Sequence, residues 1–229
     1  MTDLQIIERP SPNHDARPDG QAVDILLLHY TGMASGEAAL GRLCDPAARV
    51  SAHYLVEEDG RVFQLVSESR RAWHAGTAEW QGASDINARS IGIEIVNPGH
   101  EFGYRNFPPE QMAAVRRLAL DIVARHPVPA ARVLGHSDVA PLRKEDPGEL
   151  FDWRSLAAAG IGLWPESSSA AVLENAVGKA LKRVGYGYTE HDLPAVIRAF
   201  QRHFRPSLVT GTADAETRRR LAALLAVID

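Results

Sequence analysis

The segment Val23–Tyr30 constrains the fold most, because after Asp24 it reads ILLLHY and stays apolar until the histidine. A run without polar alternation is typical of a strand at the centre of a sheet that is covered on both faces. A second strand is predicted at 90–96, where isoleucines occupy one face and Glu94 lies on the other. The run Ile25–Leu28 is far too short to cross a bilayer, so we expect no membrane span.

Further strands and helices are predicted around these two strands. The Asp59–Gly60 pair between two β-rich runs is a hairpin signal, and a Pro-Pro start precedes apolar residues at helical spacing. The predicted elements are a short helix at 37–43, a hairpin at 51–66, an amphipathic helix at 109–126 and a strand at 132–136, followed by a long polar loop at 137–149.

The two ends of the chain differ from this middle part. Residues 1–20 are rich in Pro, Asn, Asp and Gly without periodicity, which predicts an irregular arm. After the Pro/Ser stretch at 165–169 every pattern is helical, with apolar stripes at 173–184, 193–204 and 221–228. We therefore expect two domains, at 1–165 and 166–229, the second a small three-helix unit.

Composition excludes several classes of protein. The net charge of −4 and the pI of about 6.1 give no basic footprint for nucleic acid or an anionic membrane. The first residues show no secretory signal, so we expect a cytoplasmic protein. One cysteine, Cys44, excludes an intramolecular disulfide and a multi-cysteine zinc cluster. Any metal must be held by carboxylates and by some of the nine histidines.

His29 and His136 each end an apolar strand, where a rigid element would present them. A catalytic zinc site needs about three protein ligands, and Asp146, in the loop behind His136, is a candidate for the third. On spacing alone the ordinary interpretation has even odds, because strand-end histidines and aspartates before proline are commonly rim and turn residues.

A resemblance adds to this interpretation. The ordered motifs LLLHYT, SAHYLVEEDGRVFQLV, RAWHAG, NARSIGIEI and LGHSDVAPLRKEDPG resemble the zinc-dependent N-acetylmuramoyl-L-alanine amidases, whose fold is shared with phage lysozyme-type amidases and peptidoglycan recognition proteins. The resemblance spans residues 23 to about 165. It implies a mixed central β-sheet flanked by helices, in the α/β class.

The resemblance also implies the roles of five residues. His29, His136 and Asp146 correspond to the ligands of one zinc ion, Glu94 to the catalytic glutamate and Lys144 to the catalytic lysine. Zinc activates a water at neutral pH, a glutamate can transfer its proton, and a lysine can stabilise the oxyanion. Without the resemblance, Glu94 would be an exposed strand residue and Lys144 a solvated loop cation.

Other side chains are predicted to bind substrate. Some relatives carry a catalytic tyrosine before the histidine of SAHY, but Ala52 stands here, so proton transfer should fall to Glu94. Arg71 is a candidate for a stem-peptide carboxylate, which a guanidinium binds bidentately. The remaining candidates for the wall of the substrate cleft are His53, Trp73, His74 and Asn87.

The C-terminal part resembles the small three-helix peptidoglycan-binding module through LKRVGYGY, AFQRHF and GTADAETRRRL. Helical packing explains these motifs equally well, and Phe200 and Phe204 are expected in the core. No binding residue can be named there.

The expected reaction is hydrolysis of the amide bond between N-acetylmuramic acid and L-alanine. The expected partner is a soluble 1,6-anhydro-muropeptide in cell-wall recycling, with no nucleic acid and no membrane. The alternatives are an amidase that acts on polymeric peptidoglycan, as an autolysin or endolysin does, a non-catalytic peptidoglycan-recognition protein, and a zinc hydrolase of another amide.

Overall fold

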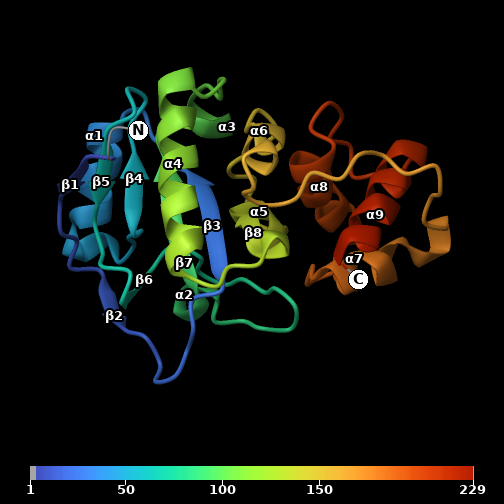
Figure 1. The fold of residues 1–229 in the computed structure, drawn as a ribbon, viewed down its shortest axis with the longest axis horizontal. Helices are drawn as coiled ribbons and strands as arrows, with labels where there is room; N and C mark the ends of the chain where they lie inside the picture. Colours follow the sequence, from blue (N-terminus) through green and yellow to red (C-terminus); the bar gives the residue numbers. More distant parts are fainter. Residues whose placement is uncertain (1–3, 229) are drawn as a thin grey trace.

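A computed structural model describes residues 4–228. Positions 1–3 of the predicted arm and position 229 of the predicted second domain lie outside the described residues. A central sheet carries helices on its faces, and the C-terminal helices lie beside one edge of it (Figure 1). This arrangement confirms the predicted α/β class.

The central sheet is mixed, with the strand order β1-β5-β4-β7-β3-β8. The pair β4–β5 is antiparallel and forms the predicted hairpin, whereas all the other pairs are parallel. In the register of β3 and β7, His29 lies beside Glu94. The strands are β1 (Ile6–Glu8), β3 (Ile25–Tyr30), β4 (Tyr54–Val56), β5 (Val62–Gln64), β7 (Ser90–Ile95) and β8 (Val133–Gly135).

The N-terminal arm contains strands, so the prediction that all of it is irregular is wrong. β1 pairs in parallel with β5, and β2 (His14–Ala16) pairs antiparallel with β6 (Arg70–Ala72) in a separate two-stranded sheet. Each strand of the arm is three residues long and pairs with a segment more than fifty residues away. Local periodicity carries no signal for such pairing, because the partner is distant in sequence.

The two faces of the sheet are covered by different helices. Ile91, Ile93 and Ile95 pack with Leu26 and Leu28 against the predicted amphipathic helix, α4 (Pro109–Arg125). The other face carries Leu27, His29 and Glu94, and over β4 and β5 it is covered by α1 (Gly36–Cys44), the predicted short helix. The alternation predicted for 90–96 is therefore confirmed, and it leaves Glu94 on the face opposite α4.

His136 does not end a strand, and the segment behind it is not simply a polar loop. β8 ends at Gly135, and His136 begins a buried helical turn, α5 (His136–Val139). The buried Asp138 carboxylate accepts a hydrogen bond of 2.7 Å from the backbone N–H of Gly135 and thereby caps this turn. The predicted loop thus begins as an ordered, buried turn.

The remaining helices are α2 (Ile86–Arg89), α3 (Gly99–Phe102), α6 (Trp153–Ala158), α7 (Val177–Val184), α8 (Leu193–Phe204) and α9 (Ala215–Ile228). No helix among the described residues is long and apolar enough to cross a membrane. Leu173, predicted to begin the first C-terminal stripe, lies before α7 and is 71% exposed, so it does not belong to that stripe.

The C-terminal helices share an apolar core with the sheet. Phe200 and Phe204 of α8 are buried, as expected, in one cluster that also contains Ile25 and Leu27 of β3 and Leu134 of β8. The helices pack beside β8 and α5 (Figure 1). The boundary at 165–169 stays a prediction, and the two parts that it would separate pack against each other through this cluster.

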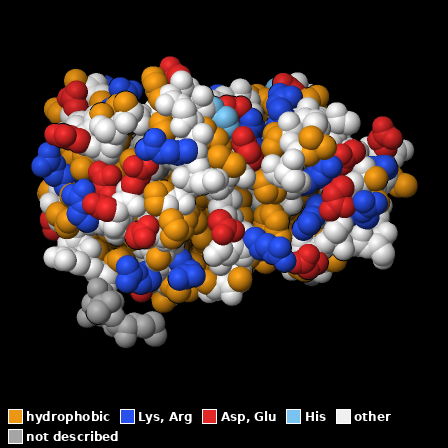
Figure 2. All heavy atoms as spheres, turned by 90° about the horizontal axis from the view of Figure 1, so that it is seen from above, with side chains coloured by type: hydrophobic (Ala, Val, Ile, Leu, Met, Phe, Trp, Pro, Cys, Tyr) orange, Lys and Arg blue, Asp and Glu red, His pale blue; other side chains and the backbone are white. Residues whose placement is uncertain are grey.

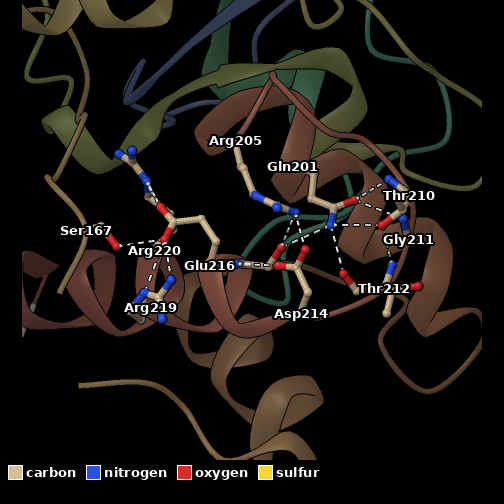
Figure 3. A network of polar contacts seen from close by, with 11 residues as sticks. Ser167, Gln201, Arg205, Thr210, Gly211, Thr212, Asp214, Glu216, Arg219 and Arg220 are labelled. Atoms are coloured by element: carbon tan, nitrogen blue, oxygen red, sulfur yellow. Dashed lines mark hydrogen bonds and ion pairs between the residues drawn. The ribbon is translucent and has the colours of Figure 1, made fainter. Parts of the chain in front are cut away.

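Polar contacts fix the loop between α8 and α9 (Figure 3). The side chain of Gln201 accepts hydrogen bonds from the backbone N–H groups of Thr210 and Gly211, at 2.8 and 2.9 Å, and donates to the carbonyl oxygen of Thr212 at 2.9 Å. Asp214 accepts from the N–H of Thr217 at the start of α9. Gln201 therefore stabilises a loop within the C-terminal part.

Replacing Phe200 with alanine tests the shared core. We expect the free energy of unfolding to fall by about 3–5 kcal/mol, because a fully buried aromatic side chain leaves a cavity. Urea unfolding should be followed by circular dichroism and by tryptophan fluorescence. The two probes should report the same loss in the free energy of unfolding. The matched change at an exposed apolar residue, Leu173→Ala, should cost less than about 0.5 kcal/mol. Equal losses in the two variants would contradict the shared core.

Candidate active site

Three ligand-type atoms converge at the ends of β3 and β8. Nδ1 of His29 lies 2.9 Å from Nδ1 of His136, and each nitrogen lies 3.1 Å from Oδ2 of Asp146. All three side chains are buried. These atoms form a group that can hold a metal ion, since they lie within 4.8 Å of one another.

Hydrogen bonds behind His29 determine which of its nitrogens carries the proton. Ser90 Oγ donates to the carbonyl oxygen of Ile86 at 2.7 Å, so Ser90 Oγ must accept from His74 Nε2, 3.3 Å away. His74 Nδ1 is then an acceptor, and Nε2–H of His29 donates to it at 3.1 Å. The proton of neutral His29 is therefore on Nε2, and its Nδ1 presents a lone pair.

The same assignment holds for His136. Its Nε2 lies 2.9 Å from the carbonyl oxygen of Ala75, which can only accept, so Nε2 carries the proton. The guanidinium of Arg143 also donates to that carbonyl. Nδ1 of His136 is left with a lone pair, like Nδ1 of His29. Outer hydrogen bonds of this kind orient metal-binding histidines.

The electrostatics suit a cation. Burial lowers the pKa of His29 to about 4, and His136 beside it adds to this effect, so the imidazole is neutral at physiological pH. Burial alone would raise the pKa of Asp146, and positive charge beside it lowers that pKa, so a cation between the three side chains favours the ionised carboxylate. Two lone pairs and an anionic oxygen thus face one another about 3 Å apart. A metal ion satisfies all three, and the donor set fits one.

Glu94 adds a carboxylate beside this group. Its Cα is paired with that of His29 in the β3–β7 register, and Oε2 is buried without a hydrogen-bond partner among residues 4–228. Burial and, secondly, the charge of Asp146 raise the pKa of Glu94 well above its usual value. A carboxyl group whose pKa is raised in this way is suited to take and release a proton.

Lys144 lies in the same cavity, two residues before Asp146. Its backbone N–H donates to the carbonyl oxygen of Ala140 at 3.1 Å, which fixes the start of its side chain. Within the described part of the chain, the ammonium group makes no hydrogen bond or ion pair. It is therefore available to a negatively charged group that enters the cavity.

The cavity that Glu94 and Lys144 line has a volume of about 190 Å³ and is open to solvent. Concave sites of this kind commonly bind small molecules. Charged side chains of both signs are interspersed on the face of the molecule drawn in Figure 2. The cavity is lined by Tyr30, Thr31, Met33, Ala39, Arg42, Leu43, Val50, Ser51, Trp73, His74, Glu94, His136, Lys144 and Asp146.

Two of the predicted substrate-binding residues line this cavity. Trp73 is partly exposed on its wall, and its backbone N–H donates to Ser51 Oγ at 2.9 Å. His74 also reaches the wall, but both of its ring nitrogens are used by His29 and Ser90. His74 is therefore better described as the support of His29 than as a binder of substrate.

The other three predicted residues lie elsewhere. His53 is fully buried; its Nδ1 accepts from the N–H of Gly92 at 3.0 Å, and its Nε2 lies 3.1 Å from the carbonyl oxygen of Arg70. Asn87 is buried, and its Oδ1 accepts from the backbone N–H groups of His74 and Ala75. Neither residue lines the cavity, and both side chains support the backbone around it, so their part in substrate binding stays a prediction.

Arg71 lies outside this cavity, and its predicted part in substrate binding stays a prediction. Its guanidinium forms ion pairs of 2.8 Å with Asp15 on β2 and 3.2 Å with Asp85, and it does not line the cavity. Asp15 belongs to the arm that was expected to be irregular, so its pairing with Arg71 could not be foreseen. A free stem-peptide carboxylate would have to compete with these two side chains.

Several residues of the site were missed. Tyr30 and Thr31 line the cavity directly after His29, and the motif LLLHYT already contained them. Ser90 begins the motif SIGIEI, but only the structure shows that its hydroxyl determines the proton position on His74. The signal for these residues was adjacency to a predicted site residue, and the geometry was needed to interpret it.

Comparisons with known proteins agree with this arrangement. A family model described as N-acetylmuramoyl-L-alanine amidase matches residues 19–149. The chain is 38% identical to the N-acetylmuramoyl-L-alanine amidase AmiD of Escherichia coli (strain K12), and the match covers 96% of this chain and 90% of that protein. It is also 38% identical to the 1,6-anhydro-N-acetylmuramyl-L-alanine amidase AmpD of the same organism, over 63% of this chain and 86% of that protein.

Solved structures are similar over nearly the whole chain. The complex of AmiD from E. coli with anhydro-N-acetylmuramic acid-L-Ala-D-gamma-Glu-L-Lys has a TM-score of 0.80 and 37% identity, and the match covers 92% of each chain. AMPDH3 from Pseudomonas aeruginosa, in complex with anhydromuramic pentapeptide, has a TM-score of 0.83 and 33% identity, over 92% of this chain and 94% of that one. Both structures contain a muropeptide.

Replacing Asp146 with asparagine tests whether His29, His136 and Asp146 hold a metal ion. The amide keeps the size of the side chain but removes the anionic oxygen, so we expect affinity for Zn²⁺ to fall by more than about 100-fold, beyond the loss typical of outer-shell changes. Competition with a chromophoric chelator measures this affinity. The control Asp121→Asn, on exposed α4 surface, should bind one ion per chain like the unmodified protein. Unchanged affinity in Asp146→Asn would exclude Asp146 as a ligand.

Proposed function

The chain belongs to the N-acetylmuramoyl-L-alanine amidase family, and from this premise we propose that it hydrolyses the bond between N-acetylmuramic acid and L-alanine with one zinc ion. The convergence of His29, His136 and Asp146 supports this proposal most directly, because His136 and Asp146 line a cavity that Glu94 and Lys144 also line. The cavity is open to solvent, so a muropeptide can reach the group from outside.

Zinc fits the donor set better than a harder cation. Two neutral imidazole nitrogens and one carboxylate oxygen are typical of a catalytic zinc site that keeps one position for water or substrate. Nδ1 of His29, Nδ1 of His136 and Oδ2 of Asp146 would hold the ion. When bound, zinc lowers the pKa of a water to about 7 and polarises a carbonyl group.

Glu94 would transfer the proton. In this proposal it takes a proton from the attacking water and returns it to the nitrogen of L-alanine as the amide bond breaks. Both steps require a carboxyl group whose pKa lies nearer to neutral than that of a solvated glutamate. Burial raises the pKa of Glu94, and Oε2, which has no partner among the described residues, is available to hold the proton.

Lys144 would stabilise the tetrahedral oxyanion. Its ammonium group lines the cavity beside Asp146 and has no anionic partner of its own among the described residues. A pre-positioned positive charge in a partly buried site stabilises charge that develops in the transition state. A recognition protein without catalysis would need neither this free cation nor a buried, unpartnered carboxylate, so the catalytic alternative is favoured.

The proposed substrate is a soluble 1,6-anhydro-muropeptide released during cell-wall recycling. The related proteins AmpD and AmiD support this choice, the first by its description and the second by its bound ligand. Trp73, partly exposed on the cavity wall, offers an apolar surface to the substrate. The expected cytoplasmic location stays a prediction, which fractionation of cells that produce the protein can test.

The C-terminal helices, at 166–229, are proposed to contact polymeric peptidoglycan, as their resemblance to a wall-binding module suggests. This role favours the alternative substrate, the intact wall. Digesting purified sacculi and anhydro-muropeptides side by side, with products separated by mass spectrometry, distinguishes the two. Release of stem peptides from anhydro-muropeptides supports the recycling proposal, and cleavage of sacculi alone would reject it.

Replacing Glu94 with glutamine tests the proton-transfer role. We expect kcat to fall by about 10²–10⁴-fold, because an amide cannot accept the proton. Zinc affinity should be retained, since Glu94 is not a ligand, and thermal stability at neutral pH should not fall, because burial disfavours the ionised carboxylate. The control Glu37→Gln, exposed on α1, should keep full activity. Substantial activity in Glu94→Gln would require another proton acceptor.

A further inference from the structure

The end of α8 carries three consecutive polar side chains that are all buried. Gln201, Arg202 and His203 have exposed fractions of 0%, 8% and 3%. Buried polar side chains in a helix require partners, because their desolvation is otherwise uncompensated. Gln201 finds its partners in the α8–α9 loop (Figure 3), whereas Arg202 and His203 reach across to the catalytic part of the chain.

Arg202 contacts the segment that carries Asp146. Its guanidinium forms an ion pair with Glu145, directly before Asp146, and its Nε lies 4.0 Å from an oxygen of Glu149. Glu149 in turn lies 3.2 Å from Nε2 of His100, whose Nδ1 is 3.0 Å from the hydroxyl of Tyr30 on the cavity wall. The buried guanidinium is thus paired with the residue directly before Asp146, while its Nε lies near Glu149 without forming a hydrogen bond.

His203 contacts the segment that carries His136. Its Nδ1 donates to Oδ2 of Asp138 at 2.7 Å, and the hydroxyl of Tyr186 donates to Oδ1 of the same carboxylate at 2.7 Å. Burial and Asp138 raise the pKa of Tyr186 well above its usual value, so that hydroxyl stays a donor. The remaining donor to this fully buried carboxylate is the backbone N–H of Gly135.

The segments that carry His136 and Asp146 are hydrogen-bonded to each other close to the proposed metal ligands. The N–H of Ser137, next to His136, donates to the carbonyl oxygen of Asp146 at 2.9 Å. The N–H groups of Arg143 and Lys144 both donate to the carbonyl oxygen of Ala140, at 3.1 Å. Arg202 and His203 therefore hold, from outside, a small hydrogen-bonded unit that contains two proposed ligands and the proposed catalytic lysine.

We propose that Arg202 and His203 are positioning residues, through which α8 orders the two segments that carry His136, Lys144 and Asp146. This inference rests on the proposed metal site. The C-terminal helices then contribute to the metal affinity of the catalytic part, in addition to any role in binding the wall. Contacts behind the ligands commonly contribute about 10–100-fold to metal affinity.

The test compares Arg202→Gln with Arg198→Gln, the same change in the same helix at a residue that lies against Gly211, away from the ligand segments. In metal-free, chelator-treated protein, amide hydrogen exchange at Ser137, Arg143 and Lys144 should become about 10-fold faster in Arg202→Gln, because local opening is easier. Zinc affinity, measured by chelator competition, should fall about 10-fold. The Arg198→Gln protein should match the unmodified protein in both measurements.

Glu145→Gln supplies a second variant. We expect this protein to fold, because the side chain of Glu145 is 48% exposed. If Arg202 acts through Glu145, this change should reproduce the faster exchange, and the double variant should add little to either single change. His203→Asn should speed exchange at Ser137 in the same way. Exchange rates in Arg202→Gln and Glu145→Gln equal to those of Arg198→Gln would overturn the inference. A protein that binds no zinc would reject the proposed function, and the exchange measurement would still decide this inference.

Discussion

Parallel pairing of β3 with β7 and β8 brings the carboxyl ends of three strands to one edge of the sheet. His29 and Glu94 become neighbours through the β3–β7 register, and the short β8 delivers His136 to the same edge. The apolar run in β3 permits this, since it is covered on both faces and tolerates a histidine only where the strand reaches the cavity. Every other feature of the site is arranged around that edge.

The polar groups around His29, His136 and Asp146 are of two kinds, those with hydrogen-bond partners and those without. The nitrogens and oxygens behind it are satisfied, in the chain that runs from Ile86 through Ser90 and His74 to His29. The groups that face the cavity, Oε2 of Glu94 and the ammonium of Lys144, have no partner among the described residues. A catalytic site requires side chains that are held rigidly by their neighbours. It also requires polar groups that are free to interact with the substrate when it enters.

Local patterns predicted the long elements well and the distant contacts poorly. Strand 90–96 and helix 109–126 follow from periodicity, which is a property of neighbouring residues, whereas the predicted strand 132–136 is only Val133–Gly135. Asp146 needed a family resemblance, because a loop carboxylate has no periodic signal. Arg71 and the arm residue Asp15 meet through pairing of β2 with β6, which no local pattern encodes. His53 and Asn87 were expected at the cavity wall and lie buried, where their side chains accept hydrogen bonds from backbone N–H groups.

The apolar cluster around Phe200 has a consequence for how such a protein can be recombined. Its members come from β3, β8, α7, α8 and α9, so the surface between the two parts belongs to both. Helices taken from a relative could not be attached behind residue 165 as a cassette, since they would meet a foreign surface of β8 and α5. Sequence change on either side must be matched on the other, which ties the evolution of the C-terminal helices to that of the amidase they accompany.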